Sequence, residues 1–183
     1  MTTKSILRKK YWLWVLGWIA LIYSTLSIVR PICEYLKKHT PFAVFMNVLM
    51  ACLLAALVIL LVFKIRIHRG ASLVWLFFVL SGYSYGLWMI KYPEEKLHFV
   101  EYGLLAFLIH RACCLDLRKE LSYIVAFILT SLAGWGDEML QGVLPNRYYQ
   151  TDDVLLNIFS GLLGLGLVFI FERERLSKCV KRF

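Results

Sequence analysis

The sequence predicts an all-α protein: a polytopic membrane bundle of about six transmembrane helices in a single membrane domain over residues 1–183. Hydrophobic residues make up 60% of the chain and charged residues 18%, against about 45–50% and about 25% in soluble domains. The apolar residues are grouped in runs of about the 20 residues that cross a bilayer, and the charged residues lie almost wholly between these runs. This distribution excludes a soluble globule and a nucleic-acid-binding surface.

The first predicted span covers residues 11–29 and follows four basic residues. A charged start is also typical of secretory signals. However, this run has the length of a full span, lacks an A-x-A cleavage site and is followed by further apolar runs. It ends at Arg30 and Pro31. The next segment, 31–39, mixes apolar and charged residues and fits either a short interfacial helix or a loop.

Five further apolar runs predict the remaining helices, at residues 42–63, 71–90, 97–115, 121–135 and 154–171. The fourth run contains His98 and Glu101, and Asp137 and Glu138 close the fifth, so these two are less purely apolar than the others. The five cysteines are scattered, without a C-x-x-C motif, and predict neither a disulfide framework nor a zinc motif. We interpret Cys113 and Cys114 as small apolar filling at the end of the fourth helix.

The basic residues predict the orientation. Placing the N-terminus in the cytoplasm puts most of the 21 Lys and Arg residues on the cytoplasmic side, including the connections at 64–69 and 111–119. This is the bias of the positive-inside rule. Both termini are then cytoplasmic, and the connections at 91–96 and 142–151 face outward.

Polar residues interrupt the apolar pattern first at residues 93–103. His98 and Glu101 are three residues apart and share one face of the predicted fourth helix, with Glu101 about 6 Å below its start. An ionisable group at this depth faces the bundle or a wet cavity. The pair fits either a proton-transfer or ligand-contact role, or a structural role that holds two helices together.

The second interruption covers residues 134–147 and the start of the sixth helix. Glu138 and Gln141 are one turn apart, and Asp153 and Asn157 are four residues apart. Hydrogen bonding between helices would explain such groups but not the surplus of acids. Because both interruptions lie on the predicted outer side, we expect them to form one outward-facing polar pocket. Arg147 fits either an anion ligand or an interfacial anchor.

These motifs resemble those of the VanZ-like family of bacterial integral membrane proteins. The resemblance rests on P-E-E-K-L-H-F-V-E-Y-G-L-L, then G-W-x-D-E-x-x-Q-x-x-x-P-x-R, then D-x-x-x-N-x-x-x-G, over roughly residues 93–171. It implies a multi-helix protein of the bacterial inner (cytoplasmic) membrane, linked in some members to reduced susceptibility to glycopeptide antibiotics such as teicoplanin. It supplies no established reaction. The family's polar signature falls on Lys96, His98, Glu101, Asp137, Glu138, Gln141, Arg147, Asp153 and Asn157.

Three functions follow as hypotheses. The first is binding of a membrane lipid or a lipid-linked cell-wall precursor, with ligand contacts from Lys96, Asp137, Gln141, Arg147, Asp153 and Asn157. The second is an envelope hydrolase or transferase that uses His98, Glu101 and Glu138 as acid–base groups. The third is a small transporter, although no internal repeat is visible. The H-x-x-E spacing could also hold zinc or manganese, but we predict no metal, no cofactor and no nucleic-acid partner. The oligomeric state is left open.

Overall fold

All regular structure is helical in the computed structural model, which describes residues 3–64, 67, 70–145 and 147–180. This confirms the all-α prediction. Two short turns flank the α-helices: a π-helical turn η1 (Leu60–Lys64) extends α2, and a 3-10 turn η2 (Pro93–Leu97) precedes α4. The six α-helices are α1 (Thr3–His39), α2 (Phe42–Ile59), α3 (Gly70–Met89), α4 (His98–Cys113), α5 (Lys119–Val143) and α6 (Thr151–Val180).

Four helical segments of the described chain are long and apolar enough to cross a membrane: Thr3–His39, Phe42–Phe63, Gly70–Met89 and Thr151–Glu174. Large apolar side chains such as Trp88 (78% exposed) and Phe63 (73% exposed) cover their outer faces, as lipid-facing helices require. With 16 residues, α4 is about 24 Å long, shorter than the roughly 30 Å hydrocarbon core. The six-span topology therefore stays a prediction.

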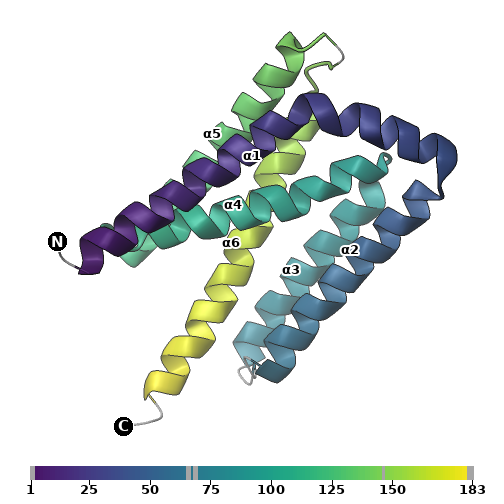
Figure 1. Cartoon of the computed structure of the whole chain (residues 1–183). Helices are drawn as coiled ribbons and strands as arrows, with labels where there is room; N and C mark the ends of the chain where they lie inside the picture. Colours follow the sequence, from purple (N-terminus) through teal and green to yellow (C-terminus); the bar gives the residue numbers. More distant parts are fainter. Residues whose placement is uncertain (1–2, 65–66, 68–69, 146, 181–183) are drawn as a thin grey trace.

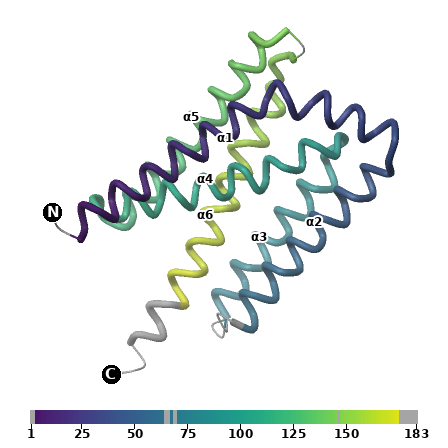
Figure 2. Tube along the Cα trace, in the orientation of Figure 1, coloured from purple at the N-terminus to yellow at the C-terminus, as the bar shows by residue number. Residues whose placement is uncertain are grey.

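The first helix is longer than predicted, because it continues through Arg30 and Pro31 to His39. The loop alternative for residues 31–39 is therefore wrong. Proline removes one backbone hydrogen bond and bends a helix. Figures 1 and 2 show that α1 changes direction along its length, so that its first part follows α4 and α5 and its second part reaches α2.

The fifth helix also runs past its predicted end at residue 135, to Val143. The prediction took Asp137 and Glu138 as residues that close the helix, but both are fully buried inside it. They continue a face of mostly small or polar residues that points into the bundle. The buried residues on this face are Ser122, Ala126, Thr130, Gly134, Asp137, Glu138 and Gln141.

The core lies where α4, α5 and α6 meet, and α4 packs most extensively on α6. Tyr102 and Leu105 of α4 are fully buried in the main apolar cluster. The backbones of α4 and α6 nearly touch at Gly103 and Gly164, where a Cβ on Gly164 would lie 2.7 Å from the Gly103 Cα. Glycine permits this close crossing because it has no side chain. The crossing fixes the position of α4, which carries His98 and Glu101.

Ion pairs bring several helix ends together at one end of the bundle. Arg8 lies 3.7 Å from Asp116, and Lys119 lies 3.3 Å from Glu172, so the start of α1, the α4–α5 connection and α6 meet there. We call this the His110 end, and the opposite end of α4 the His98 end. The prediction that the 64–69 connection is cytoplasmic falls partly on residues 65–66 and 68–69, which lie outside the described residues.

Candidate functional site: a polar cavity at the His98 end

A cavity of about 430 Å³ opens at the His98 end between α1, η2, α4 and the start of α6. Its lining combines charged and polar side chains with apolar ones, whereas other cavities of the described bundle are lined mainly by apolar side chains. The lining residues are Ile22, Thr25, Leu26, Val29, Arg30, Glu34, Lys37, Tyr92, Glu94, Glu95, Leu97, His98, Glu101, Gln141, Arg147, Tyr148, Gln150 and Asp153.

The start of α4 supplies the central pair of the cavity. The η2 turn leads directly into α4, so His98 occupies its first position and Glu101 lies one turn further on. The His98 Nδ1 is 3.4 Å from Glu101 Oε2, and both side chains are only partly exposed. The Trp18 indole N–H donates a hydrogen bond to the Glu101 carbonyl oxygen at 2.9 Å, which ties α1 to this turn.

The second part of α1 forms one wall of the cavity. Arg30 Nε lies 3.4 Å from Glu34 Oε1 on this helix, and the Lys37 ammonium pairs with the Glu94 carboxylate of η2. Glu34 and Lys37 were not predicted from the sequence, because they belong to no motif and lie in the segment 31–39, interpreted as an interfacial helix or a loop. The alternation of Arg30, Glu34 and Lys37 at helical spacing was the available signal.

The connection between α5 and α6 forms the facing wall. The Arg147 guanidinium donates a hydrogen bond from Nε to the Leu26 carbonyl oxygen at 3.3 Å, which holds the connection against α1. The Gln150 side-chain amide donates to Asp153 Oδ2 at 3.4 Å. Asp153 lies in the first turn of α6, where the helix dipole favours an acidic side chain.

Three of the predicted site residues form a buried layer and are absent from the lining: Asp137, Glu138 and Asn157. The Tyr102 hydroxyl donates to Asp137 Oδ2 at 2.7 Å, and the Gln141 amide donates to Glu138 Oε1 at 2.8 Å. Tyr102, which the sequence analysis missed, follows His98 by one turn within the same motif. The Asn157 amide donates to the Gly134 carbonyl oxygen at 3.2 Å, so each side chain of the layer makes a hydrogen bond, while Asp137 Oδ1 and Asn157 Oδ1 are buried without a partner among the described residues. Five predicted site residues line the cavity instead: His98, Glu101, Gln141, Arg147 and Asp153.

The last predicted site residue, Lys96, is directed to another helix. Its ammonium donates a hydrogen bond to the Asn47 side-chain oxygen of α2, and it is absent from the cavity lining. In this arrangement Lys96 anchors η2 to α2. The motif placed Lys96 correctly beside His98, but only the fold shows the direction of its side chain.

Glu95 gives the cavity a titratable group near neutral pH. Burial raises the pKa of the Glu95 carboxyl to about 7; the negative charge of Asp153 acts in the same direction, and His98 acts against it. Around this group the lining carries cationic side chains, Arg30, Lys37 and Arg147, among several carboxylates. A cavity with both signs of charge suits a ligand that carries both an anionic group and an amine.

Residues 84–172 match the VanZ/LLP1 family model, which confirms the VanZ-like resemblance over this region. The matched residues include η2, α4, α5 and most of α6, and therefore every cavity-lining residue outside α1. No curated protein and no solved structure gives a significant match to the chain.

Proposed function

We propose that this VanZ-like membrane protein binds the polar head of an envelope ligand, a lipid or a lipid-linked cell-wall precursor, in the cavity at the His98 end. The observation that carries the proposal is the cavity itself. About 430 Å³ of space is lined by charged groups of both signs at one end of an apolar bundle. A volume of this order accommodates a headgroup of small-molecule size.

The cost of these groups argues against a purely structural role. Ionisable side chains inside membrane bundles are destabilising, and where they occur they face the bundle interior or a water-filled cavity. Apolar contacts would join the helices at a lower cost. The buried Asp137 and Glu138 are hydrogen-bonded to protein groups, which fits a supporting layer. His98 and Glu101 instead line open space and can contact a ligand.

The proposal includes an orientation. The positive-inside rule places the His98 end at the outer surface of the bacterial inner membrane, with both termini in the cytoplasm. An outward-facing cavity would meet lipids and precursors at the outer leaflet. The link of some VanZ-like proteins to teicoplanin susceptibility fits a ligand of this kind.

Catalysis on such a ligand is the second candidate. It is favoured by one observation: His98 and Glu101 lie 3.4 Å apart at the cavity wall, within reach of a bound molecule. A histidine and a carboxylate so placed can act as a general acid–base pair in a hydrolase or transferase. Glu138 is fully buried, so in this second hypothesis it would influence the pair from inside the bundle and would not contact the bound molecule.

The decisive variant is Glu101→Gln, which keeps the size of the side chain and removes its charge. Its matched control is Glu120→Gln, which makes the same change at an exposed site at the start of α5, at the opposite end of the bundle. Both variants are expressed at the wild-type level in bacteria whose teicoplanin susceptibility depends on the protein. We expect Glu101→Gln to abolish the phenotype and Glu120→Gln to preserve it.

A wild-type phenotype in Glu101→Gln, at an unchanged amount of protein in the membrane, would refute the functional role of the cavity. Binding and catalysis are then separated with the purified protein and a lipid-linked precursor. A precursor that is retained by the protein without a change in its mass supports binding. A new product that the wild-type protein forms and the His98→Gln variant does not would establish the enzyme.

A further inference from the structure

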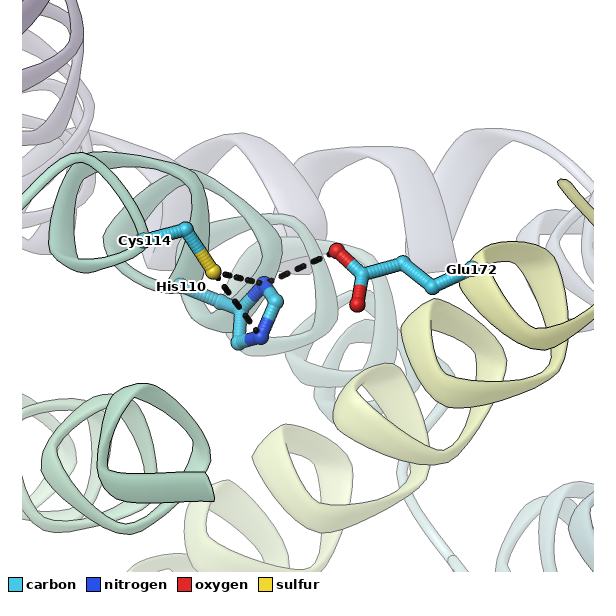
Figure 3. A group of neighbouring side chains, drawn as sticks. All are labelled: His110, Cys114 and Glu172. Atoms are coloured by element: carbon cyan, nitrogen blue, oxygen red, sulfur yellow. Dashed lines mark hydrogen bonds and ion pairs between the residues drawn. The ribbon is translucent and has the colours of Figure 1, made fainter. Parts of the chain in front are cut away.

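A second polar cluster lies at the His110 end, away from the cavity. His110 is in the last turn of α4, Cys114 caps the same helix, and Glu172 comes from α6. Figure 3 shows the three side chains turned toward one another across the gap between the two helices. Among the described residues, they form the one group of at least three metal-binding side chains whose ligand atoms all lie within 4.8 Å of one another.

The ligand atoms of this cluster lie near one another, but further apart than in a formed tetrahedral metal site. The Cys114 Sγ is 3.7 Å from His110 Nδ1, and the same nitrogen is 3.9 Å from Glu172 Oε1. With metal bonds of about 2.3 Å to sulfur and about 2.0 Å to nitrogen or oxygen, tetrahedral ligand atoms lie roughly 3.3–3.6 Å apart. Cys114 Sγ also lies 3.5 Å from His110 Nε2, so the thiol or the ring must turn until the sulfur lies on the Nδ1 side before the three ligand atoms can share one ion.

The surrounding residues hold two of these side chains in place. The Tyr123 hydroxyl donates a hydrogen bond to Glu172 Oε2 at 3.2 Å, and the Lys119 ammonium lies 3.3 Å from the same oxygen. These contacts leave Oε1 directed at the histidine, as outer-sphere partners orient metal-binding carboxylates. The His110 ring is fully buried and packs against the Tyr123 ring at 4.2 Å between centroids.

Two cations oppose binding of a metal ion at this point: Lys119 and Arg111, whose guanidinium lies 3.9 Å from Glu172 Oε1. Loss of the Cys114 thiol proton on binding offsets part of this repulsion, because it adds a negative charge next to the ion. A thiolate and an imidazole also favour zinc over magnesium or calcium, which prefer oxygen ligands.

We propose that His110 Nδ1, Cys114 Sγ and Glu172 Oε1 bind one Zn²⁺ ion, with water as the fourth ligand. The ion would join the end of α4 to α6, beyond the glycine crossing of the same two helices. This site is independent of the function proposed for the cavity. Cys113, the neighbour of Cys114, is buried in the apolar core, so for that residue the predicted role as apolar filling is confirmed.

The test uses the full chain in detergent, purified without a histidine tag and titrated with Co²⁺ and then Zn²⁺. We expect one Co²⁺ per chain, with the charge-transfer absorption of a cobalt–thiolate bond and the visible bands of tetrahedral geometry, both removed by Zn²⁺. Cys114→Ala should abolish the thiolate absorption, whereas the matched control Cys113→Ala should keep it. Glu172→Gln should weaken binding at least tenfold.

A second measurement needs no variant. Zn²⁺ should slow alkylation of Cys114 by a membrane-permeant maleimide in the wild-type protein, and a chelator should restore it, while the rate at Cys52, on α2 and outside the cluster, does not change. Co²⁺ binding without thiolate absorption would overturn the proposal. Equal alkylation of Cys114 with and without Zn²⁺ would overturn it as well.

Discussion

The crossing of α4 and α6 offers the sharpest test of the packing. Substitution by alanine should destabilise the protein at Gly164 but not at Gly103. A Cβ on Gly164 would lie 2.7 Å from both the Cα and the carbonyl oxygen of Gly103, and backbone atoms cannot rotate away. The helices must separate by about 0.7 Å before this contact reaches an ordinary 3.4 Å. Such overpacking costs about 1–3 kcal/mol.

A Cβ on Gly103, in contrast, meets its nearest atom, the Tyr83 hydroxyl oxygen, at an ordinary 3.5 Å. Replacing a helical glycine by alanine raises the free energy of unfolding by roughly 0.5–1 kcal/mol in both variants, so this contribution cancels when the two are compared. We therefore expect Gly164→Ala to unfold roughly 2–12 °C below Gly103→Ala.

The assay is thermal unfolding of the purified protein in one detergent, followed by circular dichroism. Gly17→Ala supplies a baseline, because its Cβ would meet nothing within 4 Å and should leave the protein slightly more stable than wild type. Equal unfolding temperatures for Gly164→Ala and Gly103→Ala would refute the close crossing.

Three further predictions concern the site. Glu95→Gln should raise the unfolding temperature relative to wild type at pH 8 and leave it nearly unchanged at pH 5. Burial raises the pKa of Glu95 to about 7, so the wild-type protein becomes less stable as the pH rises and this carboxyl group ionises. Tyr102→Phe removes the donor to the buried Asp137 and should destabilise the protein by about 1–3 kcal/mol in the same assay. Lys96→Met should weaken the contact of η2 with Asn47 and lower the unfolding temperature, but precursor binding measured below that temperature should be unchanged.

The sequence predicted the polar residues of the site better than it predicted their surroundings. Helical spacing correctly placed His98 and Glu101 on one face, because a single turn of one helix sets their relation. The acids at 137 and 138 were read as the end of a helix. Gln141, one turn further along α5, donates to Glu138 as the spacing indicated. The other partners are Tyr102, on a different helix, and Gln150, beyond the end of α5, and such contacts between distant residues leave no local pattern.

The course of α1 and the cluster at the His110 end could not be predicted from the sequence. Pro31 indicates either the end of a helix or a bend in it, and only the packing of α1 against α2 and α4 shows that the helix continues and passes over the cavity. The cluster at the His110 end was also missed. His110 and Cys114 lie one turn apart, but Glu172 reaches them only through the packing of α6 on α4.

The most direct test of the central claim identifies what occupies the cavity in living bacteria. A photoreactive phenylalanine analogue replaces Tyr148, which lines the cavity, or Trp88, which is 78% exposed and absent from the lining. After illumination, mass spectrometry identifies the molecules attached to each position. We predict a distinct lipid or lipid-linked precursor at Tyr148 that disappears in the Glu101→Gln background, and bulk membrane lipids at Trp88 in both backgrounds. The same adducts at both positions, unaffected by Glu101→Gln, would contradict the account.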